Sequence, residues 1–145
     1  MPAYFGKDVS KPISRLARSG ALDTGDVAAA LAIEAAVVSI LTNDLHAGYR
    51  DGVHPGNPGQ GFAEGRLLRF HDQRALYYDW VDAMTAAGLS AGPVLDVIIE
   101  GKPLTAIDLA WKKRKGWARR LVQQGLALYR SMALARKTAT ERLTA

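Results

Sequence analysis

The chain contains no cysteine among its 145 residues. This absence excludes disulfide-stabilised scaffolds, thiolate zinc sites and cysteine nucleophiles. A chain of this length corresponds to one domain, and such a domain buries roughly 68–70% of its unfolded surface, so its core needs no cross-links. Hydrophobic residues make up 48% and charged residues 23%, which is the composition of an ordinary globular domain rather than of a disordered chain.

Long uncharged apolar runs are missing as well. The first residues, MPAYFGKDVSK, contain no apolar segment of the kind that defines a secretory signal. The longest apolar stretch, residues 27–41, carries Glu34 and falls short of the roughly 18 uncharged residues that suggest a membrane span. We therefore expect a soluble, cytoplasmic protein with no membrane association.

Motifs for catalysis and metal binding are also absent from the sequence. His46, His54 and His71 lie near acidic residues, but none has the spacing of a zinc motif such as HExxH. The segment GNPGQG, residues 56–61, lacks the GK[ST] continuation of a phosphate-binding loop. No Ser/His/Asp set and no carboxylate pair has a spacing that defines a reaction. We expect no enzymatic activity, no metal and no cofactor.

Charge of both signs is present but unevenly distributed. The net charge is +5; residues 1–100 hold 8 basic and 12 acidic side chains (−4), whereas residues 101–145 hold 11 basic and 2 acidic ones (+9). Six of the nine residues from Lys112 to Arg120 are basic. A cationic segment on a mildly acidic body indicates an anionic partner, such as nucleic acid or a membrane surface.

The spacing of the apolar residues predicts an all-α fold, a small helical domain of about five to six helices. Helices are expected near residues 10–18, 23–43, 72–87, 91–99, 105–111 and 117–136. The six glycines and two prolines of residues 46–65 predict a long loop. We expect one domain over residues 1–145, divided into N-terminal helices (1–45), a Gly/Pro-rich loop (46–70), a helix-turn-helix region (71–137) and a frayed tail (138–145).

Single residues predict how some of these helices begin and pack. Ser10 and Ser90 are expected helix caps. Thr105 and Asp108 have the spacing of a capping box for the helix that starts at Thr105. Gly125, inside the last helix, is expected to mark a close helix crossing, either within the core or across a homodimer contact.

Residues 91–132 have the order of a helix-turn-helix: a short helix, a glycine-containing turn, a second short helix, a turn and a longer helix. The last helix of such a motif enters the major groove of DNA. Its face opposite the apolar stripe carries arginine and glutamine, which bond guanine and adenine bidentately. The lysines just before it suit phosphate contacts. The predicted DNA-binding residues are Lys112, Lys113, Arg114, Lys115, Trp117, Arg119, Arg120, Gln123, Gln124 and Arg130.

Residues 95–129, LDVIIEGKPLTAIDLAWKKRKGWARRLVQQGLALY, resemble a helical domain of α-proteobacterial regulators and prophage-like elements, including the central DNA-binding domain of the gene transfer agent activator. Residues 16–34, LARSGALDTGDVAAALAIE, resemble the opening of the same domain. A looser likeness links the chain to the promoter-reading domain of sigma factors. The resemblance implies a helical DNA-associated regulator. This chain differs in its long glycine-rich loop and in lacking a second DNA-binding domain, so it would act alone, as a homodimer or beside a larger regulator.

Other interpretations of the basic segment stay open. A basic helix face is often merely solvated, and helical hairpins are common. A membrane-surface role is disfavoured, because the apolar face of the last helix consists mainly of Ala, Leu and Val. The expected partner is double-stranded DNA, with the protein acting as a transcriptional regulator. The alternatives are a ring-forming, phage-type DNA-packaging recognition subunit and a protein-interaction module that docks on RNA polymerase or another regulator.

Overall fold

The computed structural model describes residues 9–46 and 60–144, with side chains described over 9–42 and 72–142. The described chain is all-helical, as the sequence predicts, and contains no strand. Its six helices are α2 (Lys11–Arg18), α3 (Thr24–His46), α4 (Gln60–Ala86), α5 (Ala91–Ile98), α6 (Leu104–Ala110) and α7 (Trp117–Thr144).

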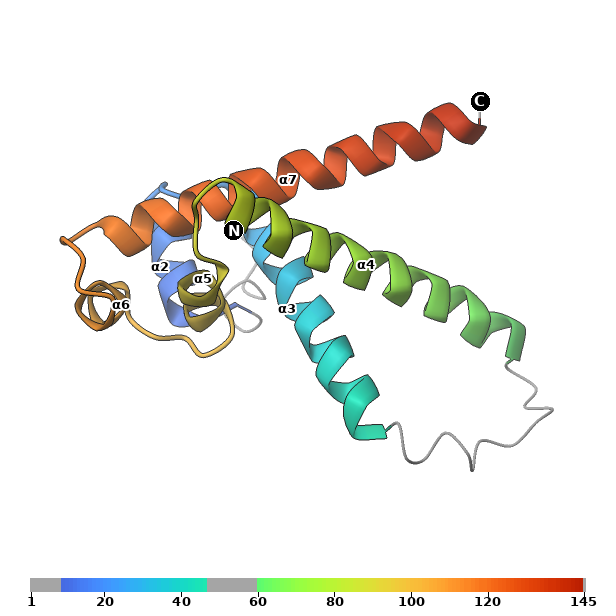
Figure 1. Ribbon diagram of the computed structural model, residues 1–145, viewed down its shortest axis with the longest axis horizontal. Helices are drawn as coiled ribbons and strands as arrows, with labels where there is room; N and C mark the ends of the chain where they lie inside the picture. The colour runs from blue at the N-terminus through green and yellow to red at the C-terminus, as the bar shows by residue number, and fades with distance from the viewer. Residues whose placement is uncertain (1–8, 47–59, 145) are drawn as a thin grey trace.

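The long helix α7 organises the molecule (Figure 1). The short helices α2, α5 and α6 gather around its first half, whereas its second half extends past them. Helices α3 and α4 cross near the middle of α7 and diverge from each other away from it (Figure 1). Helix α7 contacts α3, α4, α5 and α6. Its N-terminal half is therefore held on several sides, while the basic turn before it lies at one end of the molecule.

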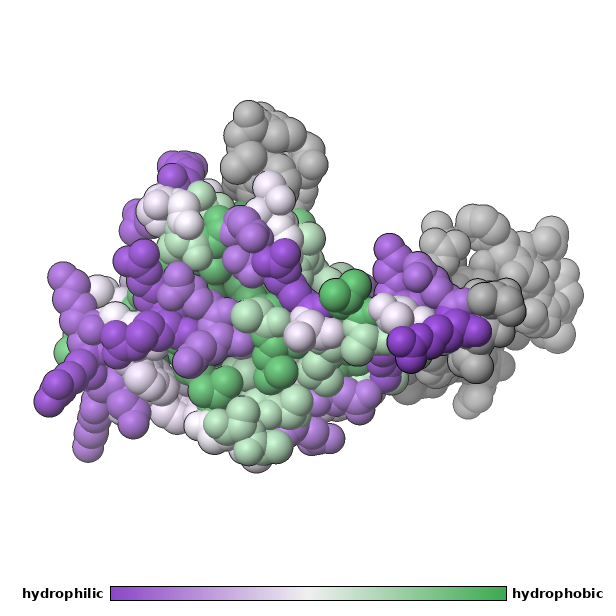
Figure 2. Space-filling model, turned by 90° about the horizontal axis from the view of Figure 1, so that it is seen from above, coloured by the Kyte–Doolittle hydropathy of each residue, from purple (hydrophilic) through white to green (hydrophobic). Residues whose placement is uncertain are grey.

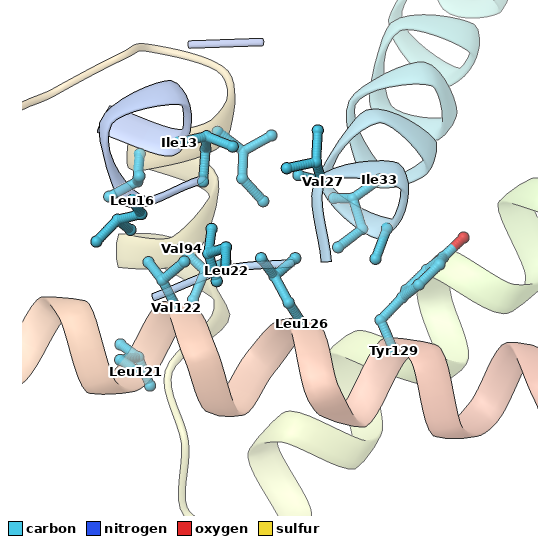
Figure 3. Packing of buried hydrophobic residues seen from close by; sticks show 14 of the residues in the cluster. Ile13, Leu16, Leu22, Val27, Ile33, Val94, Leu121, Val122, Leu126 and Tyr129 are labelled. Atoms are coloured by element: carbon cyan, nitrogen blue, oxygen red, sulfur yellow. The ribbon is translucent and has the colours of Figure 1, made fainter. Parts of the chain in front are cut away.

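The hydrophobic core forms where these helices meet (Figure 3). Val122, Leu126 and Tyr129 point from α7 toward side chains of α2, α3 and α5. Burying a large aliphatic or aromatic side chain stabilises a fold by about 1.5–3 kcal/mol. The apolar stripe of α7 thus fixes how this helix is rotated and turns its polar face outward. The largest fully buried side chains are Trp80, Ile13, Ile33, Met84, Ile107, Leu126, Val94, Val97, Val122 and Pro93.

Several helix starts follow from local sequence signals. Ser10 caps α2, and its hydroxyl accepts a hydrogen bond from the Ile13 N–H at 3.5 Å. At the start of α3, the Asp23 carboxylate accepts the Asp26 N–H at 2.9 Å and the Asp26 carboxylate accepts the Asp23 N–H at 3.0 Å. Ser90 occupies the cap position of α5, as expected, but its side chain makes no capping bond.

The close crossing expected at Gly125 lies in the core and not at the surface. A Cβ atom on this buried glycine would lie 3.2 Å from Met84 Cε and 3.5 Å from Val94 Cγ2. The Trp80 Nε1–H donates a hydrogen bond of 2.9 Å to the Gly125 carbonyl. The absent side chain lets α4 and α7 approach closely enough for this bond. Of the two options from sequence, the core contact is confirmed at Gly125.

The predicted loop is shorter than expected. Helix α3 continues through His46, and α4 already begins at Gln60, so the loop assigned to residues 46–70 is wrong over 60–70. Residues 47–59 lie outside the described residues. Both prolines of this stretch, Pro55 and Pro58, precede Gln60. An interior glycine costs a helix only about 1 kcal/mol, whereas proline costs about 3 kcal/mol, so the glycines at 61 and 65 do not prevent a helix.

The predicted frayed tail is also wrong. Helix α7 runs without a break to Thr144. Residues 138–144 contain no glycine or proline, and Ala, Glu, Arg and Leu among them are good helix formers. Because these residues favour a helix and none of them breaks it, α7 continues beyond the part that packs against the core.

Helices α5, α6 and α7 follow one another in the order expected of a helix-turn-helix, and each contacts the other two. The connection between α6 and α7 spans residues 111–116, which is longer than the three or four residues typical of the motif. The helix order thus agrees with the prediction, while the helix-turn-helix itself stays a prediction.

Helix α3 is the one described helix whose length and composition would also suit a membrane span. The stretch Thr24–Thr42 has a mean hydropathy of 1.7. Its first half carries Val27, Ala30 and Ile33, all buried in the core. Core helices of soluble proteins commonly share this composition, so α3 is only weak evidence for a membrane span.

Candidate nucleic-acid interface

The turn between α6 and α7 has a defined backbone geometry. The Lys112 N–H donates to the Leu109 carbonyl at 3.1 Å, and the Lys113 N–H donates to the Asp108 carbonyl at 2.8 Å. This pair of bonds is the Schellman arrangement that closes a helix C-terminus, with Lys112 in the position that usually holds glycine. Lys112 accordingly has a φ of +55°. A lysine held in this left-handed conformation costs roughly 1–2 kcal/mol relative to the ordinary helical region.

Asp108 fixes the start of α7. Its buried carboxylate accepts hydrogen bonds from the Gly116 N–H at 3.1 Å and the Ala118 N–H at 2.7 Å. A carboxylate at a helix N-terminus satisfies free backbone donors and is favoured by the helix dipole. The sequence predicts Asp108 to cap its own helix, α6, but the structure shows that it caps α7, so that expectation was wrong. Helix α6 begins instead at Leu104, after Pro103.

Six cations surround this anchored turn and form what we call the basic surface: Lys112, Lys113, Arg114, Lys115, Arg119 and Arg120. All six are exposed. The ion pairs found in the described part of the chain involve other cations, Lys102, Arg130 and Arg136. Figure 2 shows hydrophilic side chains projecting at the end of the molecule where α6 meets α7. The basic surface therefore presents its charge to solvent, and none of its six cations has a counter-ion among the described residues.

A pocket of about 270 Å³ lies beside the basic surface and brings four predicted residues together. Lys113, Trp117, Arg120 and Gln124 line it, together with Trp111 and residues 88–90 of the α4–α5 connection. The Lys113 ammonium lies 5.5 Å from the centre of the Trp117 ring, within cation–π range. The Trp111 and Trp117 rings are 6.1 Å apart and inclined by 34°.

Two predicted residues are engaged elsewhere. The Gln123 side-chain amide donates to the Ala21 carbonyl at 3.1 Å. Arg130 forms ion pairs with Asp23 and Asp26, at 2.9 and 3.0 Å, on the opposite part of the fold. The hydrogen bonds that Arg130 donates to Asp26 and Asp23 raise the pKa of its guanidinium. Gln123 connects α7 to the α2–α3 connection and Arg130 connects it to the start of α3, so neither is gathered at the basic surface.

Trp111 is the residue that sequence reasoning missed. Trp111 is the C-cap of α6, and 43% of its surface is exposed. The neighbouring Leu109 is 78% exposed. The segment WKKRKGW, residues 111–117, carried the signal, because aromatic residues that flank a basic run are typical of nucleic-acid binding.

Comparison of the chain with protein-family models, curated protein sequences and solved structures gives no match. Within the described residues, no group of three or more His, Asp or Glu side chains is placed to hold a metal ion. The side chains of His46, His54 and His71 lie outside the described residues. The candidate site is therefore defined by its own geometry and charge alone.

Proposed function

We propose that this protein binds double-stranded DNA through the basic surface and acts as a regulator of transcription. The observation that carries the proposal is the set of six exposed cations with no ion pair in the described part of the chain, grouped on one anchored turn and one helix start. Side chains without intramolecular counter-ions are free to replace the cations condensed on DNA, which is the main source of sequence-independent affinity.

The position of each cation suggests its role. Lys112–Lys115 project from the turn and would contact phosphates, which orient a protein on the duplex. Arg119 and Arg120 lie in the first turns of α7, where side chains of a recognition helix meet base edges. Gln124, one turn further and also exposed, would join them. Gln123 and Arg130 are not part of this proposal, because they hold α7 to the N-terminal part of the fold.

The regulatory part of the proposal rests on the resemblance of residues 95–129 and 16–34 to helical regulators of bacterial and prophage origin. The packing of α7 supports the proposal, because it fixes the orientation of this helix. The stripe of α7 that contains Val122 and Leu126 is buried, so the neighbouring face is presented at a fixed angle. A fixed helix lets a few arginine contacts discriminate bases, since each bidentate contact contributes about 1–3 kcal/mol.

The test is duplex binding as a function of salt concentration. The wild-type protein is expected to bind short duplexes with an affinity that falls steeply with added salt. Lys113→Ala should weaken binding evenly across sequences and reduce the salt slope by about one, whereas Arg119→Ala should cost about 1–3 kcal/mol on a selected site and relax specificity there. Lys137→Ala is the matched control, because Lys137 is also an exposed cation of α7 but lies in its second half.

Lys112→Gly separates binding from stability. Glycine adopts the left-handed conformation of position 112 without strain, so the variant should unfold at the same or a higher denaturant concentration. It should nevertheless bind duplex DNA more weakly, since one phosphate contact is lost. Absence of salt-sensitive duplex binding in the wild-type protein would overturn the proposal. Retention of an acidic protein partner from nuclease-treated lysate, without DNA affinity, would replace it by a protein-docking function.

A further inference from the structure

The pocket between the α4–α5 connection, the α6–α7 turn and α7 has a chemical character that duplex phosphates alone do not explain. Its aromatic lining consists of Trp111 and Trp117, and its charged lining of Lys113 and Arg120. No carboxylate lines it, and Ser90 and Gln124 supply its uncharged polar side chains. Such a pocket suits a ligand that is planar and anionic at the same time.

Trp111 differs from the other tryptophans of the chain. Trp80 is fully buried, and Trp117 is partly buried against the core and lies beneath the Lys113 ammonium. Trp111 keeps 43% of its surface open to solvent. An exposed aromatic surface beside phosphate-binding cations is the arrangement that proteins use to stack an unpaired base.

The fold holds this ring in place from two directions. Trp111 ends α6 at the start of the Schellman turn, where its N–H donates to the Ile107 carbonyl at 3.0 Å. On the other side, its ring lies 3.9 Å from where a Cβ atom of Gly92 in α5 would be. Arg120 reaches back over the turn, since its Nη1 lies 3.7 Å from the corresponding point at Gly116. The Trp111 ring and the Arg120 guanidinium both line this pocket.

We propose that this pocket holds one unpaired nucleotide, with its base stacked on Trp111 and its phosphate on Lys113 and Arg120. Arg119, which does not line the pocket, is then left to contact base edges of the paired DNA. The inference rests on the proposed function and narrows it: the protein prefers DNA in which a base has left the helical stack over a fully paired duplex. Single-stranded DNA and a duplex with one extrahelical nucleotide both present such a base. A duplex of the same sequence does so only after a pair has opened, which costs free energy.

The experiment measures the affinity of the full chain for three fluorescently labelled DNAs of one sequence: the duplex, the duplex with a single unpaired thymine, and the single strand. The wild-type protein should bind the DNAs with an unpaired base about tenfold more tightly than the duplex. Trp111→Ala should remove this preference and leave duplex affinity unchanged, whereas Trp111→Phe should retain part of it because phenylalanine still stacks. Tyr78→Ala is the matched control, since Tyr78 is an aromatic residue of α4 with similar exposure outside the pocket.

Tryptophan fluorescence provides a second readout. Stacking of a base on Trp111 should quench emission more in the wild-type protein than in Trp111→Ala, because the tryptophans that remain in the variant are Trp80, which is fully buried, and Trp117, which is partly buried against the core. Equal affinity of the wild-type protein for all three DNAs would overturn the nucleotide pocket and leave duplex binding standing. An equal loss on all three DNAs in Trp111→Ala would also overturn it, by assigning Trp111 a structural role in the turn. Absence of DNA binding, together with binding to vesicles of anionic lipid, would overturn both proposals.

Discussion

At the scale of single residues, Asp108 has the largest structural consequence for the candidate site. Its carbonyl accepts the Lys113 N–H, and its carboxylate accepts the Gly116 and Ala118 N–H groups. One buried residue thus holds both ends of the turn that carries the lysines. Because these donors are partly or fully buried, they cannot all turn to water if the carboxylate is removed.

Asp108→Ala is therefore expected to lower the free energy of unfolding by about 1–3 kcal/mol, the cost of leaving buried donors without an acceptor. Asp108→Asn should lose less, since the amide oxygen can still accept one of the two bonds. Urea denaturation followed by circular dichroism measures both. Equal stability of wild type and Asp108→Ala would show that the carboxylate does not hold the start of α7.

At the scale of helices, the crossing of α4 and α7 decides how the recognition face is presented. Gly125 lies against Met84, and its carbonyl accepts the Trp80 indole N–H. A side chain at position 125 would push α4 and α7 apart. The flexible end of Met84 can move a few tenths of an ångström for one added methyl group, but not for a branched side chain.

Gly125→Val is expected to destabilise the protein by about 1–3 kcal/mol through overpacking. Ala127→Val is the matched control, because Ala127 is exposed on the same helix and should change stability by less than about 0.5 kcal/mol. Thermal unfolding compares the two variants. Similar stability of both would contradict a tight crossing at Gly125.

At the scale of the whole molecule, ion pairs connect the basic C-terminal part to the acidic body. Arg130 pairs with Asp23 and Asp26 at the start of α3, and Arg136 pairs with Asp72 and Asp79 of α4. The pKa of Asp23 lies below its ordinary value of 3.8. The hydrogen bond from the Asp26 N–H is the main cause; burial opposes it, and Arg130 adds to it. Four acidic residues of the N-terminal part therefore form ion pairs that help to orient α7.

Because the pKa of Asp23 is lower in the folded state, its contribution to stability is present above pH 3.8 and is lost as the pH falls through the folded-state pKa. Arg130→Ala should raise the pKa of Asp23 toward 3.8 without fully restoring it, since the Asp26 N–H bond remains. The stability difference between wild type and variant should narrow below about pH 4. Carboxyl NMR titration measures this pKa, and Lys102→Ala should leave it unchanged. An unaltered Asp23 pKa in Arg130→Ala would contradict the coupling.

The all-helical fold and most helix ends follow from the sequence alone, because these depend on residues three or four positions apart. Ser10 caps α2, and Gly88, with a φ of +74°, follows the end of α4 as expected. The sequence also located the basic segment. The sequence analysis predicted a loop over residues 60–70 and a frayed tail over 138–144, but both segments are helical. Neither contains proline, and the helix propensity of the other residues outweighs the cost of two glycines in the first segment and the lack of core packing in the second.

Which members of the predicted site lie together depends on contacts between helices that are distant in the sequence. Gln123 and Arg130 lie at helical spacing from Arg119 and Arg120, yet contacts with Ala21 and Asp23, about a hundred residues away in the chain, remove them from the basic surface. Trp111 joined the site because the α4–α5 connection and α7 line the same pocket as the α6–α7 turn. Local spacing sets which residues share a helix face. Which face is buried, and which distant residue holds each side chain, depends on packing between helices that are remote in sequence.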